Sequence, residues 1–343
     1  MTVLQERTAS LDRLDLSAKK LDFDSIPLID IADLTHPDRA RRETVARKIG
    51  EACEHVGFFY VTNHGVPQAL LDAIYGVADR FFAMPTEEKL KVDIHKADRH
   101  RGYVPVGGLH ADAHNTGSHD LQEGFELSLE LPETDPDYLA GNPMYGPNVW
   151  PEHPADFKEI ANGYYSEMIS LGRRLFGGFA LALGLEESWF EPKIEKPMGQ
   201  LRVLYYPPQA GTVDPNQIGI GAHTDYECFT ILAQSEHGLQ VQNRKGEWIA
   251  APPIPGAFVV NIGDCMQRWT NDRFRSTVHR VINLSGKKRY SLAFFYGANY
   301  HATIECLPTC QDKANPPRHP PVKAGDWTVA NIKAAYTYVP KAI

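Results

Sequence analysis

Nine short runs of β-type residues follow one another after residue 200, and they constrain the fold more than any other feature of the sequence. The runs lie at 201–206, 218–223, 228–233, 238–242, 247–250, 257–262, 276–282, 289–297 and 302–306, with turn signals between them. Many short strands at regular spacing are typical of a closed β-sandwich or jelly roll. We therefore predict a mainly β fold with a jelly-roll core over residues 200–343.

The first 199 residues have a different texture. Apolar residues at helical spacing predict helices at 38–56, 68–84 and 156–183, and strands are expected at 26–31, 57–62 and 125–131. Gly184 directly after the longest helix suits a helix C-terminus. We expect a helical N-terminal region over residues 1–199 that forms one integrated unit with the core.

Composition excludes several classes of function. A formal charge of -8 over 343 residues argues against a general nucleic-acid binder. No apolar run reaches the roughly 18 residues that a membrane span needs, and the polar N-terminus lacks the apolar segment of a signal peptide. The five cysteines are scattered and form no C-x-x-C pair, as expected of reduced cytosolic thiols. We predict a cytoplasmic protein with a small-molecule substrate and no nucleic-acid or membrane partner, acting as a monomer with larger assemblies left open.

Two histidines and one carboxylate provide the strongest chemical signal. His223 and Asp225 lie two residues apart in a run that otherwise reads as strand, so their side chains are expected on one face. His279 lies in a later β-like run. Two histidines and a carboxylate without a thiolate form the facial triad that binds non-haem Fe(II) with open coordination positions. Zinc accepts the same ligands, but no candidate general base at motif spacing accompanies them.

A second pattern predicts a receptor for a carboxylate. Arg289 and Ser291 are two residues apart in a strand-like run and share a face. A guanidinium fork beside a hydroxyl binds carboxylates well. In LRVLYYPPQ, Arg202, Leu204 and Tyr206 alternate on one face, and Tyr206 is placed to offer a further hydroxyl to the same carboxylate.

The segment 95–124 is polar and rich in histidine. A zinc site formed by His110, His114 and His119 is one interpretation, although the spacing matches no standard zinc pattern. A mobile loop beside a pocket is the other interpretation.

Together these motifs resemble the 2-oxoglutarate- and Fe(II)-dependent dioxygenases of the isopenicillin N synthase-like superfamily. The resemblance covers most of the chain, through IPLIDIADL, ACEHVGFFYVTNHGVP, FFAMPTEEK, RGYVP, YYPPQ, HTDYECFTIL, GLQVQNRKGEW, NIGDCMQRWTNDRFRSTVHRV and RYSLAFF. It implies a double-stranded β-helix, or jelly-roll, core behind an N-terminal helical part.

The resemblance also implies roles for individual residues. His223, Asp225 and His279 would be the iron ligands and catalytic centre. Arg289 and Ser291 would hold the far carboxylate of 2-oxoglutarate, with Tyr206 also contacting this cosubstrate. Many plant members have Asn where this chain has Leu204, and RVL-x-x-PPQ looks instead like bacterial ethylene-forming members. Arg202 would then contact the near carboxylate of the cosubstrate or the substrate.

The implied reaction uses Fe(II), 2-oxoglutarate and O2 to oxidise an unactivated C–H bond of a small organic molecule by hydroxylation, desaturation or ring closure, with release of succinate and CO2. Because the carboxylate ligand Asp225 is present, halogenation is disfavoured. Two alternatives stay open: an Fe(II) oxidase that does not use 2-oxoglutarate, like isopenicillin N synthase or aminocyclopropane-carboxylate oxidase, and a non-catalytic jelly-roll binding protein.

The substrate is the least constrained part of the prediction. Arg101, Tyr103, Tyr226 and Phe295 are candidate substrate contacts. Their mixture of aromatic and basic groups suits a small organic acid, an amino-acid derivative or a secondary-metabolite scaffold.

Overall fold

Two facing β-sheets form the centre of the molecule. The computed structural model describes residues 26–108, 120–208, 218–283 and 285–335. The large sheet has the strand order β1-β2-β10-β7-β12-β5-β4-β3, and the small sheet has the order β6-β11-β8-β9. This pair of sheets confirms the predicted jelly-roll core.

Strands of the large sheet come from both halves of the chain. They are β1 (Leu28–Asp30), β2 (Phe58–Thr62), β3 (Gly102–Val104), β4 (Glu123–Ser128), β5 (Gln200–Tyr206), β7 (Phe229–Gln234), β10 (Phe258–Ile262) and β12 (Arg289–Tyr296). The small sheet contains β6 (Ile220–His223), β8 (Leu239–Gln242), β9 (Trp248–Ala250) and β11 (His279–Val281). A separate hairpin pairs β13 (Thr303–Ile304) with β14 (Val322–Lys323). Since strands from the N-terminal region complete the large sheet, the exact boundary at residue 199 stays a prediction.

The helices lie mostly in the N-terminal half. They are α2 (Arg39–His55), α3 (Gln68–Phe82), α4 (Thr86–Lys89), α5 (Pro136–Leu139), α6 (Phe157–Ala182), α7 (Asp264–Trp269) and α8 (Ala324–Ala335). The three long predicted helices are confirmed as α2, α3 and α6, and each of the nine predicted runs overlaps a strand. The short elements β3, α5 and α7 were not predicted, because three to six residues hold too little periodicity to be recognised.

Two apolar cores lie on the two faces of the large sheet. The outer core packs α2, α3 and α6 against the sheet, with Ile49, Phe81 and Phe176 among its buried side chains. The inner core lies between the two sheets and includes Leu204 and Val281. Because side chains alternate along each strand, one face of the large sheet packs against the helices and the other face lines the space between the two sheets.

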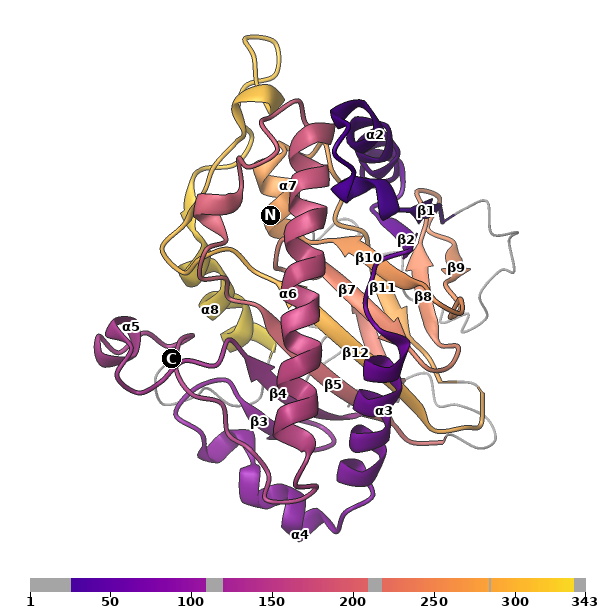
Figure 1. The fold of residues 1–343 in the computed structure, drawn as a ribbon, viewed down its shortest axis with the longest axis vertical. Helices are drawn as coiled ribbons and strands as arrows, with labels where there is room; N and C mark the ends of the chain where they lie inside the picture. The colour runs from indigo at the N-terminus through magenta and orange to yellow at the C-terminus, as the bar shows by residue number, and fades with distance from the viewer. Residues whose placement is uncertain (1–25, 109–119, 209–217, 284, 336–343) are drawn as a thin grey trace.

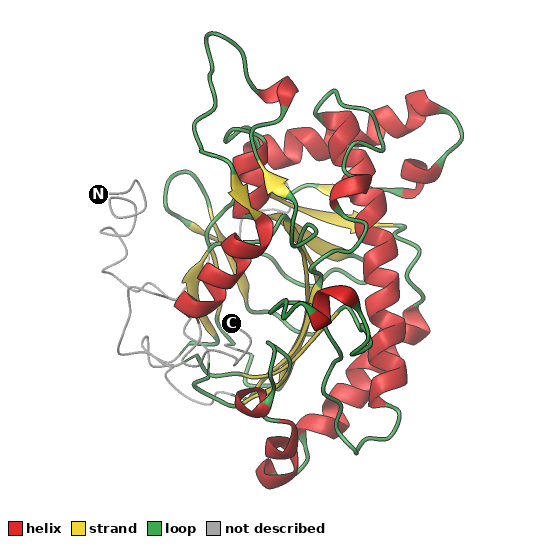
Figure 2. Ribbon diagram, turned by 90° about the vertical axis from the view of Figure 1, so that its left-hand side faces the viewer, coloured by secondary structure: helices red, strands yellow, loops and turns green. Residues whose placement is uncertain are grey.

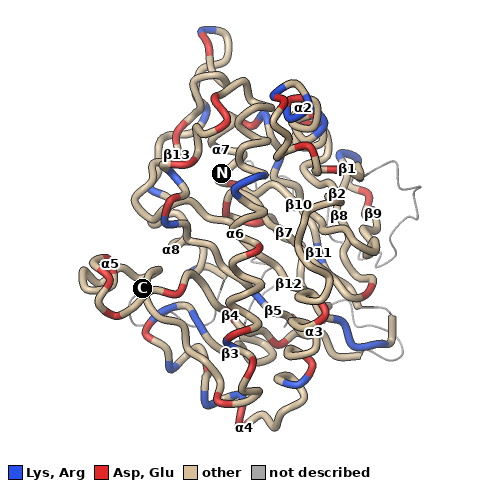
Figure 3. The backbone as a smooth tube through the Cα atoms, in the orientation of Figure 1, with Lys and Arg blue, Asp and Glu red and all other residues tan. Residues whose placement is uncertain are grey.

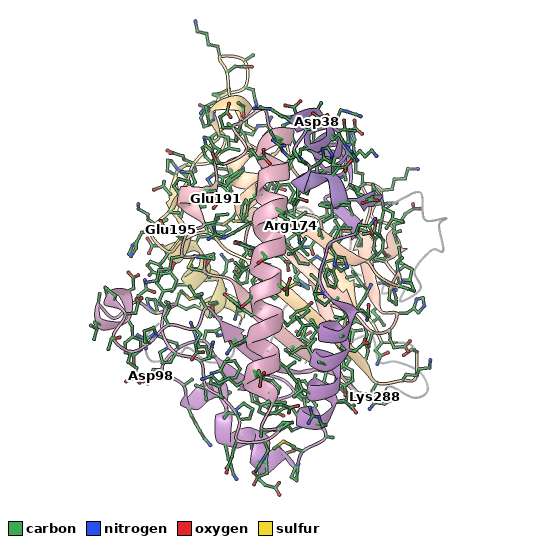
Figure 4. The ribbon with its side chains drawn as sticks, viewed as in Figure 1. Asp38, Asp98, Arg174, Glu191, Glu195 and Lys288 are labelled. Carbon is green, nitrogen blue, oxygen red and sulfur yellow. The ribbon has the colours of Figure 1, made fainter. Side chains whose placement is uncertain are left out.

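Helix α6 organises the outer layer. It runs the length of the molecule beside α3 in front of the large sheet (Figure 1), and Figure 2 shows helices forming an outer layer against the strands. Arg174, labelled in Figure 4, lies on α6, and its Nη2 donates to the carbonyl oxygen of His64 at 2.6 Å. This bond ties the helix to the turn that follows β2. Gly184 has a φ of 71°, which confirms the predicted C-terminal glycine of the helix.

The surface carries both signs of charge. In the view of Figure 3, acidic and basic positions are interspersed along the chain instead of gathering over one element. Within the residues that the structure describes, none of the helices has the length and apolar character needed to cross a bilayer.

The close approach of α6 to β12 can be tested by adding single methyl groups. A Cβ at Gly172 would overlap the ring of Tyr296, whereas a Cβ at Gly163 would lie 3.6 Å from Leu70. Gly172→Ala is expected to destabilise the protein by about 1–3 kcal/mol through overpacking. Gly163→Ala should be neutral or should stabilise by up to about 1 kcal/mol, because alanine favours the helix. Urea denaturation of the two variants measures the difference, and equal stabilities would contradict this packing.

Candidate active site

His223 and His279 meet because β6 and β11 pair. The two residues are directly opposite in the antiparallel register, and their ring centroids are 4.3 Å apart. Strand β6 ends at His223. Asp225 therefore lies just beyond the strand, whereas the sequence predicted both residues within one strand-like run. Its Oδ1 is nevertheless 3.6 Å from the Nε2 of each histidine, and one ligand atom from each residue lies within 4.8 Å of the others. The three predicted ligands therefore converge.

Each histidine is held in the tautomer that a metal requires. The Nδ1 of His223 is 2.8 Å from the carbonyl oxygen of Gly221, and the Nδ1 of His279 is 3.2 Å from that of Thr277. A carbonyl oxygen only accepts, so each Nδ1 donates, and in the neutral imidazole Nε2 then carries the lone pair that binds a metal. Burial, together with the neighbouring His279, lowers the pKa of His223 to about 4. His223 is therefore neutral at physiological pH.

The two carboxylate oxygens of Asp225 have different partners. Oδ2 accepts a hydrogen bond from the Thr230 hydroxyl at 2.5 Å and another from Asn261 Nδ2 at 2.6 Å. Burial acts to raise the pKa of Asp225, but the histidines and these two donors outweigh it and the pKa lies below its usual value. The carboxylate is thus ionised, and Oδ1 remains directed toward the histidines.

This donor set fits Fe(II). Two imidazole nitrogens and one carboxylate oxygen, arranged on one side, are the ligands of the facial triad. Three protein ligands leave further coordination positions for small molecules. In the part of the chain that the structure describes, this is the one group of His, Cys, Asp and Glu side chains with metal-binding geometry.

Arg289 forms a buried cationic site on β12. Its side chain is 0 % exposed, and its Nη1 donates to the Ser291 hydroxyl at 2.6 Å, while Nη2 donates to Gln234 Oε1 at 3.1 Å. The guanidinium lies 4.6 Å from the ring centre of Tyr206, whose hydroxyl is within reach of Arg289 and Ser291. Burial lowers the pKa of Arg289, and among the described residues no carboxylate forms an ion pair with it. Buried charges are normally paired, so the site fits the carboxylate of a ligand.

Arg202 and Leu204 occupy the next positions on the same inner face. Leu204 is opposite Ser291, and Arg202 is opposite Ala293 in the β5–β12 register. Arg202 Nε donates to Glu126 Oε1 at 2.6 Å, and its guanidinium lies 5.1 Å from the ring centre of Phe295. The charge of Arg202 is therefore compensated by the protein, unlike that of Arg289.

A cavity lies over the inner face of β3, β4 and β5. Its walls are formed by Val104, Pro105, Gln122, Gly124, Glu126, Arg202 and Leu204. Both polar and apolar side chains line it.

Two of the four candidate substrate contacts are placed near this cavity. Phe295 lies under the guanidinium of Arg202. Burial raises the pKa of Tyr226, and Glu227 raises it further. Arg202 and Glu126 are among the other charges that act on the Tyr226 hydroxyl. The carbonyl oxygen of Tyr226 accepts a hydrogen bond from Trp327 Nε1 of α8 at 2.8 Å.

The other two candidates, Arg101 and Tyr103, are not among the residues that line this cavity, and their contact with a substrate stays a prediction. The ring of Tyr103 packs against Phe81 of α3, and its hydroxyl donates to Glu123 at 2.6 Å. Arg101 donates to the carbonyl oxygen of Met144 and lies near Tyr165 of α6. Because β3 is so short, its inward and outward faces were not distinguishable from sequence. His110, His114 and His119 lie outside the described residues.

Several contributing residues were missed by the sequence analysis. They are Thr230, Gln234, Asn261, Gln122 and Glu126. Each is a polar residue within or beside an otherwise apolar strand, and this pattern is the signal that could have identified them.

Comparison with known proteins agrees with this geometry. Residues 26–153 match the family model described as "non-haem dioxygenase in morphine synthesis N-terminal", and residues 197–298 match that of the "2OG-Fe(II) oxygenase superfamily". The chain is 37% identical to the 2-oxoglutarate-Fe(II) type oxidoreductase hxnY of Emericella nidulans, over 90% of each chain. It is 39% identical to homoarginine-6-hydroxylase 2-ODD-C23 of Glycine max, over 86% of this chain and 92% of that protein.

The fold also resembles solved structures. A full-length protein of Neurospora crassa, crystallised in complex with alpha-KG and thymine, superimposes with a TM-score of 0.81 and 28% identity, over 93% of this chain and 99% of that chain.

The hydrogen bond from Thr230 to Asp225 predicts the effect of its removal on metal binding. Thr230→Val keeps the shape of the side chain but removes the donor, so the affinity for Fe(II) is expected to fall by about 10- to 100-fold. Anaerobic metal titration of the metal-free protein provides the measurement. Thr44→Val is the control, because the Thr44 hydroxyl bonds only to Ala40 of its own helix. Equal affinities in the Thr230 variant and the wild type would contradict the proposed orientation of Asp225.

Proposed function

The chain belongs to the 2OG-Fe(II) oxygenase superfamily, and from this premise we propose a role for each group in the site. The protein is an Fe(II)- and 2-oxoglutarate-dependent oxygenase. In a hydroxylation of this type, one atom of O2 enters the small-molecule substrate and the other enters succinate, while 2-oxoglutarate loses CO2. The Emericella nidulans relative is named as a 2-oxoglutarate-Fe(II) type oxidoreductase, so the oxidase without 2-oxoglutarate and the non-catalytic binding protein are set aside.

We propose that His223, Asp225 and His279 hold Fe(II). The bound metal supplies the activation of O2, and the protein supplies the ligands and their orientation. The carbonyl oxygens of Gly221 and Thr277 fix the two imidazoles, and Thr230 and Asn261 fix the carboxylate.

The proposed receptor for 2-oxoglutarate is the group of Arg289, Ser291 and Tyr206. The single observation that carries this proposal is the fully buried guanidinium of Arg289, which has no acidic partner among the described residues. A dicarboxylate placed with one end on this group would compensate the charge. Its other end would then extend along the inner face of β12 and β5 toward the histidines. Leu204 lies beside this path and would give it an apolar wall.

The substrate is proposed to bind over β3, β4 and β5. Phe295 and Tyr226 supply aromatic surface, and Arg202 supplies hydrogen-bond donors at a fixed position. Homoarginine, named for one relative, and thymine, bound in a similar structure, are both small polar molecules that contain nitrogen. The mixed polar and apolar lining supports a substrate of the same general kind for this chain. Arg202 is assigned to the substrate and not to the cosubstrate, because Glu126 already compensates its charge.

Removal of the Asp225 carboxylate tests the metal site. Asp225→Ala leaves two histidines without the anionic ligand, so 2-oxoglutarate-dependent succinate formation is expected to be lost. Full activity in this variant would overturn the assignment of the three ligands.

Removal of the Arg289 guanidinium tests the cosubstrate site. Loss of one partner of a buried charge pair costs about 2–5 kcal/mol, so Arg289→Ala should raise the KM for 2-oxoglutarate on the order of 30-fold or more. Steady-state succinate assays provide the values. Arg47→Ala serves as the control, because Arg47 is exposed and pairs only with Glu51 one helical turn away. An unchanged KM would place the cosubstrate carboxylate elsewhere.

A further inference from the structure

We propose that the side-chain amide of Gln122 recognises the substrate, and that the substrate carries an N–H group attached to a planar carbon, as in an amide, a ureide or a guanidinium. This inference rests on the proposed function, since it assigns a further contact in the same cavity.

The backbone around Gln122 is fixed at the junction of the two sheets. Leu121 N donates to the carbonyl oxygen of Ile218 at 3.0 Å, and the carboxylate of Asp120 accepts from Gly221 N at 3.1 Å. On its other side, Gln122 leads directly into β4, where Glu123 is opposite Tyr205. Gly221 in turn accepts the hydrogen bond of His223. Gln122 is therefore anchored both to the segment that carries the first histidine and to the strand that carries Glu126.

The amide itself has unused hydrogen-bonding capacity. Gln122 is 4% exposed, lines the cavity, and its Oε1 has no hydrogen-bond partner within the described part of the chain. Two other glutamines of the large sheet are bonded: Gln200 donates to Glu126 at 2.9 Å, and Gln234 donates to Ala251 at 2.7 Å while accepting from Arg289. A buried amide without a partner is unfavourable. A ligand in the cavity is the natural source of that partner.

The cavity is separate from the receptor for 2-oxoglutarate. Its lining, as far as the described residues show, includes Leu204 but not Arg289, Ser291 or Tyr206. A dicarboxylate that occupies the Arg289 receptor would leave the part of the cavity over β3 and β4 to the second reactant. Gln122 is thus assigned to the substrate.

The polar groups of the cavity define what the substrate must offer. Arg202 provides only donors and therefore binds an acceptor such as a carbonyl oxygen. Gln122 Oε1 requires a donor, and its NH2 group can supply one in return. An amide or ureide edge satisfies this combination, and a guanidinium does so only in a molecule that also carries an acceptor, such as a carboxylate, for Arg202. Val104, Pro105 and Leu204 provide apolar walls for the carbon skeleton.

Three variants separate recognition from folding. Gln122→Leu removes both the donor and the acceptor, while Gln122→Glu keeps the acceptor and the size. Gly124→Ala narrows the same cavity without touching its polar groups, because the new Cβ would lie 3.4 Å from Leu204 and 3.7 Å from Val104, which are ordinary contacts. Gln68→Leu is the matched control, since Gln68 lies on the surface of α3 and bonds only to Asp72.

The probes form pairs in which one member lacks N–H groups on a planar carbon: thymine against 1,3-dimethylthymine, and homoarginine against 2-aminononanoate, which keeps the amino-acid end and the chain length. Their dissociation constants are measured by anaerobic calorimetry on the full chain loaded with Fe(II) and 2-oxoglutarate, and the affinity for 2-oxoglutarate is measured separately. We expect wild type to bind at least one N–H compound at least tenfold more tightly than its counterpart. Gln122→Leu should remove that preference, and Gln122→Glu should retain more of the preference than Gln122→Leu does. Gly124→Ala should weaken the binding of both members of a pair. The affinity for 2-oxoglutarate should be unchanged in all of them.

The proposal is overturned if Gln122→Leu binds the preferred probe as tightly as wild type does, or if the N–H compounds have no advantage. It is also overturned if the wild-type protein binds 2-oxoglutarate but binds none of the N–H probes. Failure of Fe(II)-loaded wild type to bind 2-oxoglutarate is a distinct result, which would contradict the proposed function itself.

Discussion

The carboxylate of Asp225 connects the two sheets at the point where the chemistry takes place. Its Oδ2 is held by Thr230 of β7 and Asn261 of β10, both in the large sheet, while its Oδ1 faces two histidines carried by β6 and β11 of the small sheet. These bonds fix which oxygen is available to a metal and where the two sheets meet. The metal site is therefore a property of sheet packing as much as of the three ligands.

The two inward-facing arginines of the large sheet have different electrostatic environments. This difference separates a part of the site that favours a carboxylate from a part that favours a neutral polar group. Arg202 is compensated by Glu126 and covered by Phe295, so it can bind a neutral polar group without adding uncompensated charge. Arg289 is fully buried beside Ser291 and has no acidic partner among the described residues, so it favours a carboxylate. Leu204 lies between the strand positions of these two residues. The cosubstrate and the substrate are thus directed to neighbouring parts of one face.

Much of this arrangement could be predicted from the sequence, because period-two alternation places Arg289, Ser291 and Tyr206 on inward positions and because the β-type runs are long enough to recognise. The convergence of His223 and His279 depends on strand pairing, which no local pattern shows. The direction in which Tyr103 points, toward Phe81, could not be predicted, because its strand has only three residues and either face was compatible with the sequence. The polar residue Gln122 beside an apolar strand was a signal in the sequence, but the missing partner of its amide oxygen is visible only in the packed structure.

One face of the jelly roll is proposed to bind Fe(II) and 2-oxoglutarate together. The most direct measurement is an anaerobic titration in which metal-free protein receives one equivalent of Fe(II) and then 2-oxoglutarate, followed by visible absorption spectroscopy. We expect the weak charge-transfer band of a 2-oxo acid chelated to Fe(II), saturating at one cosubstrate per protein. Protein that binds Fe(II) but develops no such band would contradict this account.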